Sequence, residues 1–552
     1  MSLRKGRGPK KSTREPGSPT LERKGLNSLL DSFRASLLLQ VSGFFLLILI
    51  AKWPVLHDPP VWDTAMSVFP AAITLEEYNF DLPRLLAEPS YIEAGPNVHA
   101  QSLITLITAL LLRFTGGNTM FLPAVHLFHF LITALTLTAI YHYSRPILGD
   151  LVSLLSTLAI LTFPLFLTQT GYMYLEMPLT FTAIMAFLAW RDRQPYQAGL
   201  WGALSCWIKP TGILVGFALT IAALLGPGQI RERCQRAVVV GIPPLSLTVL
   251  QAWLATGAVS QGEGQGVLAA LQCALLEIPR YFPRVPDLAF FLGSFFVGSA
   301  VLHRRLWAGL RHPGRDDPDM DRNQFLTLNF LAVVSFLFMI YVVAPLSHGL
   351  CAGLPRYYVV ILPFILMTLT YCLITLMSRK QTALVIVLII GFFIINRNGI
   401  WYPSDVDQQG MFGNNFALTE RSGAYRELAR LQREAMHFLE QLPVHVPIYF
   451  GHHEDYLNRY PSMGYVKNTM GNAQSIATLS LSKLKQTWVD APECVYVLYN
   501  YPWLGGERIQ LLVSKMKATH NSETVRIFQS GENKIIVHRM RRPGSTCNGE
   551  TR

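Results

Sequence analysis

Residues 198–225 read AGLWGALSCWIKPTGILVGFALTIAALL, an apolar stretch with a single charged residue, Lys209, followed directly by Pro210. A helix that spans a bilayer takes about 20 apolar residues, so this stretch is long enough to enter a membrane. Proline has no backbone N–H and disfavours a helical conformation in the residue before it, so a helix is expected to end at Lys209. We therefore predict two short crossings, with Lys209 between them at the outer membrane face.

Similar apolar stretches recur along the chain up to Ile395. The 552-residue sequence is 51% hydrophobic and 15% charged, whereas soluble globular proteins carry about 25% charged residues. We therefore expect a polytopic α-helical membrane domain over residues 36–396 and a soluble domain over residues 397–552, where charged residues become ordinary in frequency. The other predicted crossings are residues 36–53, 121–141, 147–169, 178–190, 237–256, 288–303, 325–344, 357–377 and 382–395.

Basic residues predict the orientation of these crossings, because short loops rich in Lys and Arg stay on the cytoplasmic side of a membrane. All the short basic loops fall on that side if residues 99–114 lie in the outer interface and residues 198–225 cross twice. This arrangement gives about eleven crossings, with the N-terminus inside and the C-terminal domain outside. The tail, residues 1–35, is basic and rich in Gly, Pro and Ser, so we predict that it is disordered.

The predicted topology explains the net charge of +12, because many of the basic residues lie in the tail and in the loops beside apolar stretches. We therefore expect the bilayer, and no nucleic acid, as a partner. The sequence has no Walker, Rossmann or GxSxG motif placed between a predicted strand and a predicted helix, as these motifs require. Their absence argues against nucleotide binding and serine hydrolase chemistry.

The C-terminal region has the periodicity of a small α/β domain. Residues 421–441 have helical spacing, residues 446–450 and 494–499 have the composition of buried strands, and residues 524–528 and 534–538 are predicted to form a hairpin. The adjacent polar residues His452, His453, Glu454 and Asp455 could bind a ligand, but a solvated loop is the favoured interpretation. We expect the domain to bind an acceptor or to have a structural role.

The predicted topology places most of the polar residues of the apolar region on the outer side, which indicates an active site there. Asp63 lies in the first outer loop, where a carboxylate could act as a general base toward an acceptor hydroxyl or amine. An N-cap for a helix that begins near Thr64 explains Asp63 equally well. Asp58 is less attractive as a base, because Pro59 and Pro60 hold it in a turn.

Further outer residues could contact a charged substrate. Asn97 and His99 introduce the stretch 99–114, and His99 could bind a phosphate or a metal, although a hydrogen bond at the interface is the more ordinary explanation. Glu176 is an acid at a membrane boundary, which is costly unless the acid is solvated or paired. Lys209 is its expected partner, and a purely structural ion pair is the alternative.

The segment that opens the tenth crossing carries Arg356, whose planar guanidinium can bind two phosphate oxygens. Tyr357 beside it is equally at home in an interfacial aromatic belt, and His348 in the same loop is a weaker candidate. The seven cysteines lack metal-ligand spacing, so we interpret them as small apolar residues of the core.

These features, in this order, resemble the GT-C glycosyltransferases, above all the bacterial aminoarabinose transferases and the protein O-mannosyltransferases. The likeness covers residues 36–395 as an order of features, and the C-terminal domain also looks like the periplasmic domain of some members. The sequence departs from the family pattern at Thr64, at Glu176 and at Pro96-Asn97. The matching features are Asp63, the helix start at residues 96–99, the acid Glu176, the stretch Lys209-Pro210-Thr211-Gly212, and Pro355-Arg356-Tyr357-Tyr358.

The resemblance implies inverting transfer of a sugar from a polyprenyl-phosphate donor to a lipid, glycan or protein acceptor at the outer membrane face. Asp63 would activate the acceptor, and Lys209 and Arg356 would hold the donor phosphate, whose departure creates negative charge. It implies no certain cofactor, and a divalent metal is possible. The donor site or the metal would be held by Glu176, Asn97 and His99.

A transporter or flippase for lipid-linked sugars is the main alternative. Transporters usually have ionisable residues near the middle of the membrane and an internal repeat, whereas here the charged candidates gather on one side and no repeat is visible. A scaffold would explain the soluble domain but not the one-sided polar residues. The resemblance favours a bacterial inner membrane, with the active site and the C-terminal domain on its periplasmic or extracellular side.

Overall fold

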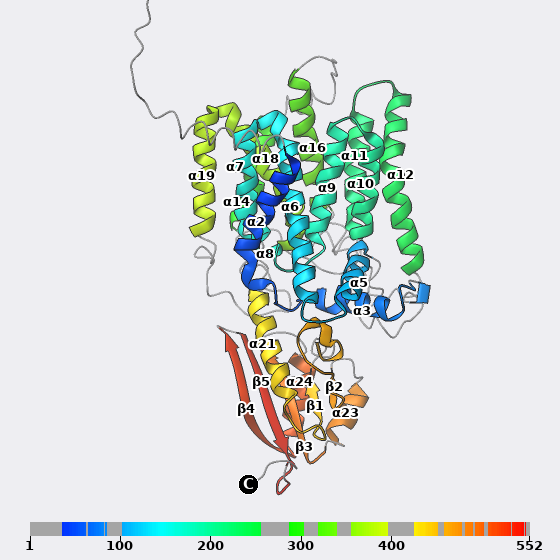
Figure 1. Cartoon of the computed structure of the whole chain (residues 1–552), viewed down its shortest axis with the longest axis vertical. Helices are drawn as coiled ribbons and strands as arrows, with labels where there is room; N and C mark the ends of the chain where they lie inside the picture. The colour runs from blue at the N-terminus through cyan, green and yellow to red at the C-terminus, as the bar shows by residue number, and fades with distance from the viewer. Residues whose placement is uncertain are drawn as a thin grey trace, which may run out of the picture.

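The computed structural model places a bundle of helices against one end of a smaller domain that contains a β-sheet (Figure 1). The predicted disordered tail, residues 1–35, and the segment 396–423 lie outside the residues that the structure describes. The described residues are 36–61, 64–81, 83–84, 102–255, 286–302, 318–338, 340, 355–395, 424–450, 457–476, 481–489, 492–501, 506–530, 533–545 and 547.

The bundle begins with α2 (Leu37–Lys52), whose N-cap is Ser36, and with the 3-10 turn η1 (Trp53–Val55) that follows it. The longer helices are α6 (Phe121–Leu148), α7 (Asp150–Thr162), α9 (Glu176–Arg191), α10 (Pro195–Ile208), α11 (Ile213–Leu225), α12 (Ile230–Ala255), α14 (Pro286–Val301), α16 (Pro318–Phe338), α18 (Leu362–Leu376) and α19 (Arg379–Ile395). The short elements are η2 (Thr64–Val68), α3 (Phe69–Glu77), α5 (Leu103–Thr115), α8 (Pro164–Gln169), η4 (Pro210–Gly212) and η7 (Pro355–Val359).

Several helices of the bundle expose apolar side chains outward, as a lipid-facing surface would. Leu38 and Ile50 of α2 are 76% and 67% exposed, and Leu388 and Ile395 of α19 are 65% and 72% exposed. Among the described residues, two helical stretches are by themselves long and apolar enough to span a membrane, Leu37–Val55 and Phe121–Leu148. The count of about eleven crossings therefore stays a prediction.

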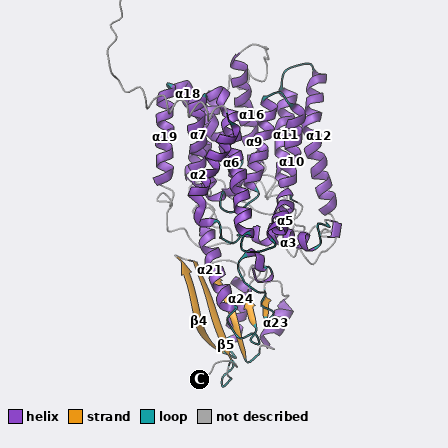
Figure 2. Ribbon diagram, in the orientation of Figure 1, coloured by secondary structure: helices purple, strands orange, loops and turns teal. Residues whose placement is uncertain are grey.

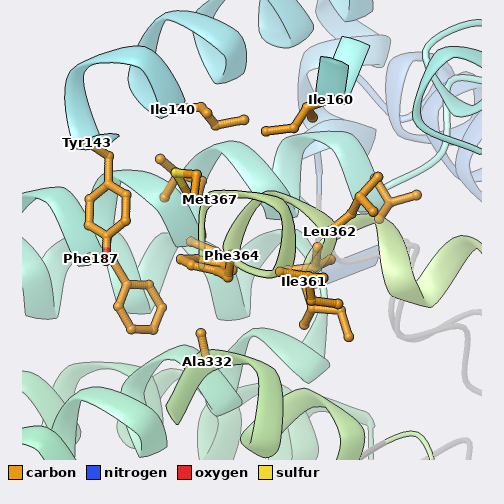
Figure 3. Close-up of a cluster of buried hydrophobic side chains, with 14 of the residues drawn as sticks. Ile140, Tyr143, Ile160, Phe187, Ala332, Ile361, Leu362, Phe364 and Met367 are labelled. Atoms are coloured by element: carbon orange, nitrogen blue, oxygen red, sulfur yellow. The ribbon is translucent and has the colours of Figure 1, made fainter. Parts of the chain in front are cut away.

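The interior of the bundle is an apolar core to which several helices contribute (Figure 3). The Phe364 ring of α18 packs against Phe187 of α9, with ring centroids 5.0 Å apart, and against Tyr143 of α6. Three polar side chains in this core are hydrogen-bonded to one another: the Tyr143 hydroxyl donates to Asn329 Oδ1 (3.0 Å), and Asn329 Nδ2 donates to the Thr368 hydroxyl (3.1 Å). Such pairing removes the cost of burying them in an apolar environment.

The helix ends agree with the expected break at one place and differ at another. α10 ends at Ile208 and α11 begins after the 3-10 turn η4, so the predicted break at Lys209-Pro210 is confirmed. A helical turn begins at Thr64, where the alternative interpretation of Asp63 as an N-cap places a helix start. Residues 147–169, predicted as one crossing, are divided, because Gly149 adopts a positive φ between α6 and α7 and Pro164 begins α8.

The helices α3 and α5 pack against each other at the end of the bundle nearest the sheet (Figure 1). α5 covers most of the stretch that the sequence places in the outer interface, and its 13 residues are too few for a full crossing. Residues 99–101 of that stretch lie outside the described part of the chain. The position of α5 supports an interfacial role.

The C-terminal domain is built on a five-stranded sheet in the order β2-β1-β3-β5-β4, with helices beside it (Figure 2). β1 pairs in parallel with β2 and β3, whereas β5 pairs antiparallel with β3 and β4, so the predicted hairpin and both predicted strands are confirmed. The elements are α21 (Ala424–Leu439), β1 (Ile448–Phe450), η9 (Pro461–Met463), β2 (Ala473–Ser475), α23 (Leu481–Val489), β3 (Cys494–Tyr501), α24 (Gly506–Met516), β4 (Asn521–Ser530) and β5 (Asn533–Arg541).

Two cysteines have a different role from the one that the sequence suggested. Cys494 at the start of β3 and Cys547 near the C-terminus form a disulfide, with Cα atoms 5.5 Å apart. The interpretation of all seven cysteines as core residues is therefore wrong for this pair. The disulfide closes a loop of 53 residues, a separation that leaves no local pattern in the sequence.

Candidate functional site

Lys209 lies at the break between α10 and α11, with its backbone extended (φ −153°, ψ 136°). Its N–H still donates to the Ser205 carbonyl (3.0 Å), and its own carbonyl accepts from the Gly212 N–H (2.8 Å). Gly212 is required here by space, because a Cβ at this position would overlap the backbone of Ser205. The tight turn therefore fixes the point from which the Lys209 side chain leaves.

Glu176 is the first residue of α9, at a helix N-terminus that favours a negative charge. The preceding residues Tyr172, Met173 and Tyr174 are buried in an apolar cluster that also includes Leu428 and Met436 of α21. The start of α9 therefore lies at the end of the bundle that contacts the C-terminal domain.

Glu176, Lys209 and Arg356 form a buried cluster of charges, which we call the cation cluster. Lys209 Nζ lies 2.6 Å from Glu176 Oε1, and Arg356 Nε lies 3.6 Å from the same oxygen. The three residues are between 2% and 6% exposed. The pairing of Glu176 with Lys209 that the sequence favoured is thus present, and two cations share one carboxylate.

Aromatic rings surround the two cations. Lys209 Nζ lies 4.6 Å from the centre of the Tyr357 ring, and the Arg356 guanidinium lies 4.9 Å from the centre of the Tyr174 ring. The faces of aromatic rings attract cations. Tyr357, which the sequence left open between an interfacial anchor and a site residue, therefore contacts the site, and Tyr174 is a site residue that the sequence analysis missed.

The cluster assembles from elements that are remote in sequence: Glu176 from α9, Lys209 from the end of α10, and Arg356 from η7. Three charged side chains carry a formal net charge of +1 in a buried place. A buried charge of this kind is stabilised by an anion, and the planar guanidinium of Arg356 suits the two oxygens of a phosphate or carboxylate.

Four of the candidates, Asp63, Asn97, His99 and His348, lie outside the described residues, as does the polar stretch 452–455. The described neighbours of Asp63 are held firmly: Val61 is buried, and the buried Thr64 donates a hydrogen bond from Oγ1 to the Met173 carbonyl (3.4 Å). Thr64 thus connects the first outer loop to the segment that leads into Glu176.

Within the described ranges, no group of three or more His, Cys, Asp or Glu side chains is arranged to hold a metal ion. Glu176 is the acid of the cation cluster, and the cations Lys209 and Arg356 beside it repel a metal ion in the same place.

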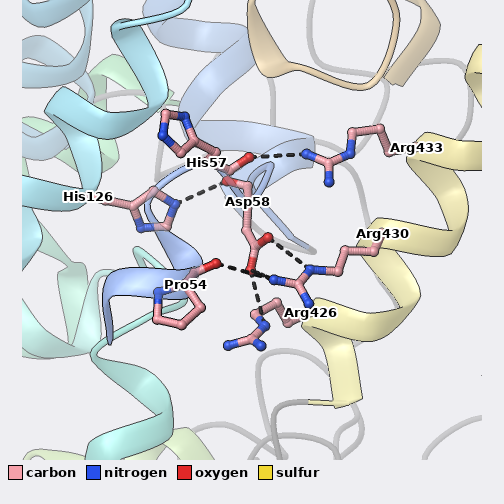
Figure 4. Close-up of polar contacts among 7 residues, drawn as sticks. All are labelled: Pro54, His57, Asp58, His126, Arg426, Arg430 and Arg433. Carbon is pink, nitrogen blue, oxygen red and sulfur yellow. Dashed lines mark hydrogen bonds and ion pairs between the residues drawn. The ribbon is translucent and has the colours of Figure 1, made fainter. Parts of the chain in front are cut away.

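Asp58 has a role that the sequence analysis missed. The residue is 5% exposed, and its carboxylate forms ion pairs with Arg426 (3.1 Å) and Arg430 (3.0 Å) of α21 (Figure 4). The signal that could have suggested this contact is the spacing of Arg426, Arg430 and Arg433, which places three arginines on one face of a predicted helix.

Comparisons with known proteins identify the fold. No protein-family model matches the chain, and no curated protein matches it. The crystal structure of ArnT from Cupriavidus metallidurans in the apo state matches 90% of this chain and 98% of its own, with a TM-score of 0.50 and 13% identity. The structure of the same protein bound to undecaprenyl phosphate matches 90% of this chain and 97% of its own, with a TM-score of 0.48 and 12% identity. The chain is therefore a polytopic helical membrane protein with the GT-C fold.

Proposed function

We propose that this protein is a membrane glycosyltransferase that moves a sugar from a polyprenyl-phosphate donor to a lipid, glycan or protein acceptor. The observation that carries the proposal is the cation cluster, in which the buried cations Lys209 and Arg356 lie side by side against the Glu176 carboxylate. A donor phosphate placed against Lys209 and Arg356 would bring negative charge to both cations. Both cations would then stabilise the phosphate as it leaves with increased charge.

The proposed reaction is a single displacement with inversion. The acceptor oxygen or nitrogen attacks the anomeric carbon of the sugar while the bond from that carbon to the phosphate oxygen breaks. Asp63 takes the proton of the acceptor as a general base, and the polyprenyl phosphate leaves with the bonding electrons. Asn97 and His99 belong to the proposed donor site, and a divalent metal there stays part of the hypothesis.

The proposed site lies at the outer membrane face, periplasmic or extracellular. α9 runs from Glu176, beside the C-terminal domain, to Arg191 at the far end of the bundle, so the basic loop that follows it lies on the opposite side from the site (Figure 1). Disulfides persist in oxidising compartments outside the cytosol, and the Cys494–Cys547 disulfide supports an outer location for the domain.

Transfer by purified full-length protein tests the proposal. Radiolabelled polyprenyl-phosphate sugars are incubated with a membrane extract as acceptor, and wild type is compared with Asp63→Asn. We expect transfer by wild type and its loss, by roughly 100-fold or more, in the variant, with the same thermal unfolding. Full transfer by Asp63→Asn would contradict the assignment of the base, and no transfer by wild type with any donor would contradict the proposal.

A further inference from the structure

The segment that leads to Asp63, residues 54–61, is held by the C-terminal domain; we call it the Asp58 segment. The Asp58 carboxylate accepts two hydrogen bonds from Arg430, from Nε to Oδ1 (3.0 Å) and from Nη2 to Oδ2 (3.3 Å). Arg426 Nε adds an ion pair to Oδ2 (3.1 Å). Two parallel hydrogen bonds from a guanidinium fix the orientation of a carboxylate as well as its position.

The same face of α21 also binds the backbone of the Asp58 segment. Arg430 Nη2 donates to the Pro54 carbonyl (3.2 Å) and Arg433 Nη1 donates to the His57 carbonyl (3.1 Å) (Figure 4). Beyond α21, the Tyr465 hydroxyl donates to the Pro60 carbonyl (2.6 Å). Contacts from the domain are thus spread along the segment from its first residues to its last.

The bundle holds the segment from its other side. His126 of α6 is fully buried, and its Nε2 lies 3.0 Å from the Asp58 carbonyl oxygen. Thr64, just beyond the segment, is tied to the Met173 carbonyl. The Asp58 segment is therefore held between the bundle and the C-terminal domain, and its contact with Arg430 joins two residues that are 372 positions apart in the sequence.

We infer that the C-terminal domain positions the general base: Asp58, Arg426 and Arg430 act as positioning residues that fix the segment leading to Asp63. This inference rests on the proposed function, in which Asp63 accepts the acceptor proton. A displacement of about 1 Å in a reacting group can cost roughly 100-fold in rate.

Weakening the contacts of the Asp58 segment is expected to change kcat but not the KM for the donor. The cations that hold the donor phosphate come from α10 and η7, and Glu176 from α9, so none of them belongs to the Asp58 segment. Loosening the contacts of the Asp58 segment should therefore lower kcat and leave the KM for the donor unchanged. A general loss of structure would instead affect both constants and the melting temperature.

The experiment compares full-length wild type with Asp58→Asn, Asp58→Glu and Arg430→Gln, and uses Arg539→Gln as the matched control. Arg539 pairs with Glu523 within the sheet of the same domain, so its replacement breaks an ion pair without touching the Asp58 segment. We expect kcat to fall about tenfold or more in Asp58→Asn and Arg430→Gln. We also expect partial recovery in Asp58→Glu, wild-type kcat in the control, and the same donor KM within about twofold throughout.

Amide hydrogen exchange gives a readout that does not depend on activity. In Asp58→Asn and Arg430→Gln, exchange should become faster in residues 54–61 and in α21, with the rest of the bundle unchanged. Unchanged kcat, with or without faster exchange, would overturn the inference, as would a raised donor KM at constant kcat. Full transfer by Asp63→Asn would overturn the assignment of the base. If instead only the positioning role of Asp58 and Arg430 is wrong, their variants keep the wild-type kcat while Asp63→Asn is still inactive. The two failures are therefore distinguishable.

Discussion

At the scale of single residues, the cation cluster has an uneven balance of charge. Glu176 Oε1 is shared between Lys209 at 2.6 Å and Arg356 at 3.6 Å, and all three side chains are buried. When one charged side chain of a buried cluster is removed, the loss of stability depends on whether the remaining charges still have an opposite charge beside them. The loss of Glu176 and the loss of Lys209 are therefore not equivalent.

We predict that Glu176→Gln lowers the melting temperature of the purified protein more than Lys209→Met does. Glu176→Gln removes from Lys209 and Arg356 the carboxylate that they share, whereas Lys209→Met leaves Glu176 beside Arg356. Breaking a buried ion pair by removing one partner costs about 3–5 kcal/mol. Thermal unfolding in one detergent measures both variants, and a larger loss in Lys209→Met would contradict this picture of the charge balance.

The sequence predicted a contact between two residues only where one of them is costly to bury without an opposite charge. Glu176 at a membrane boundary needs a cation, and Lys209 was the available one. Asp58 did not require a partner, because an acid in a Pro-rich loop can be solvated. Its partners on α21 lie in a domain whose packing against the bundle the sequence does not predict. Arg356 could be proposed for phosphate binding, but its approach to Glu176 depends on how α18 packs.

At the scale of elements, the turn between α10 and α11 sets the position of Lys209. Pro210 predicted the break, because its effect on the backbone is local. The closeness of Gly212 to Ser205 could not be predicted, since it depends on how tightly η4 folds back on the end of α10. Likewise, the hairpin of β4 and β5 follows from local signals, whereas the parallel pairing of β1 with β2 and β3 joins distant segments.

We predict that Gly212→Ala destabilises the protein and lowers transfer, because the added methyl would displace η4 from α10 and move Lys209. Overpacking of this kind costs about 1–3 kcal/mol. Gly293→Ala in α14 is the matched control, since a Cβ there meets no atom within 4 Å. Thermal unfolding and transfer rates measure both variants, and equal behaviour of the two would contradict the proposed role of the turn.

At the scale of the whole molecule, the site, the C-terminal domain and the Asp58 segment all lie at one end of the bundle (Figure 1). Composition and charge predicted a membrane part followed by a soluble part. They did not predict that the two share an apolar cluster, in which Val61 and Tyr172 meet residues of α21 and β1. Such a contact depends on surface complementarity between distant segments.

We predict that the disulfide forms only when the C-terminal domain reaches an oxidising compartment. In intact cells, Cys494 and Cys547 should resist thiol labelling until a reductant is added. Cys547→Ser should destabilise the domain by roughly 2–5 kcal/mol, seen as faster hydrogen exchange in β3 and β5. Cys234→Ser, at an exposed free cysteine of α12, is the control. Labelling of Cys494 in wild type without reductant would contradict the outer orientation.

The measurement that tests the central claim most directly is the fate of the donor phosphate in proteoliposomes that contain the full-length protein. With a doubly labelled polyprenyl-phosphate sugar and an acceptor extract, we predict one free polyprenyl phosphate for each sugar found on the acceptor. Lys209→Met and Arg356→Lys should lower both yields together, by about tenfold or more, because each removes a contact proposed to stabilise the leaving phosphate. Movement of the intact sugar lipid across the bilayer, with no release of polyprenyl phosphate, would contradict the account and identify a transporter instead.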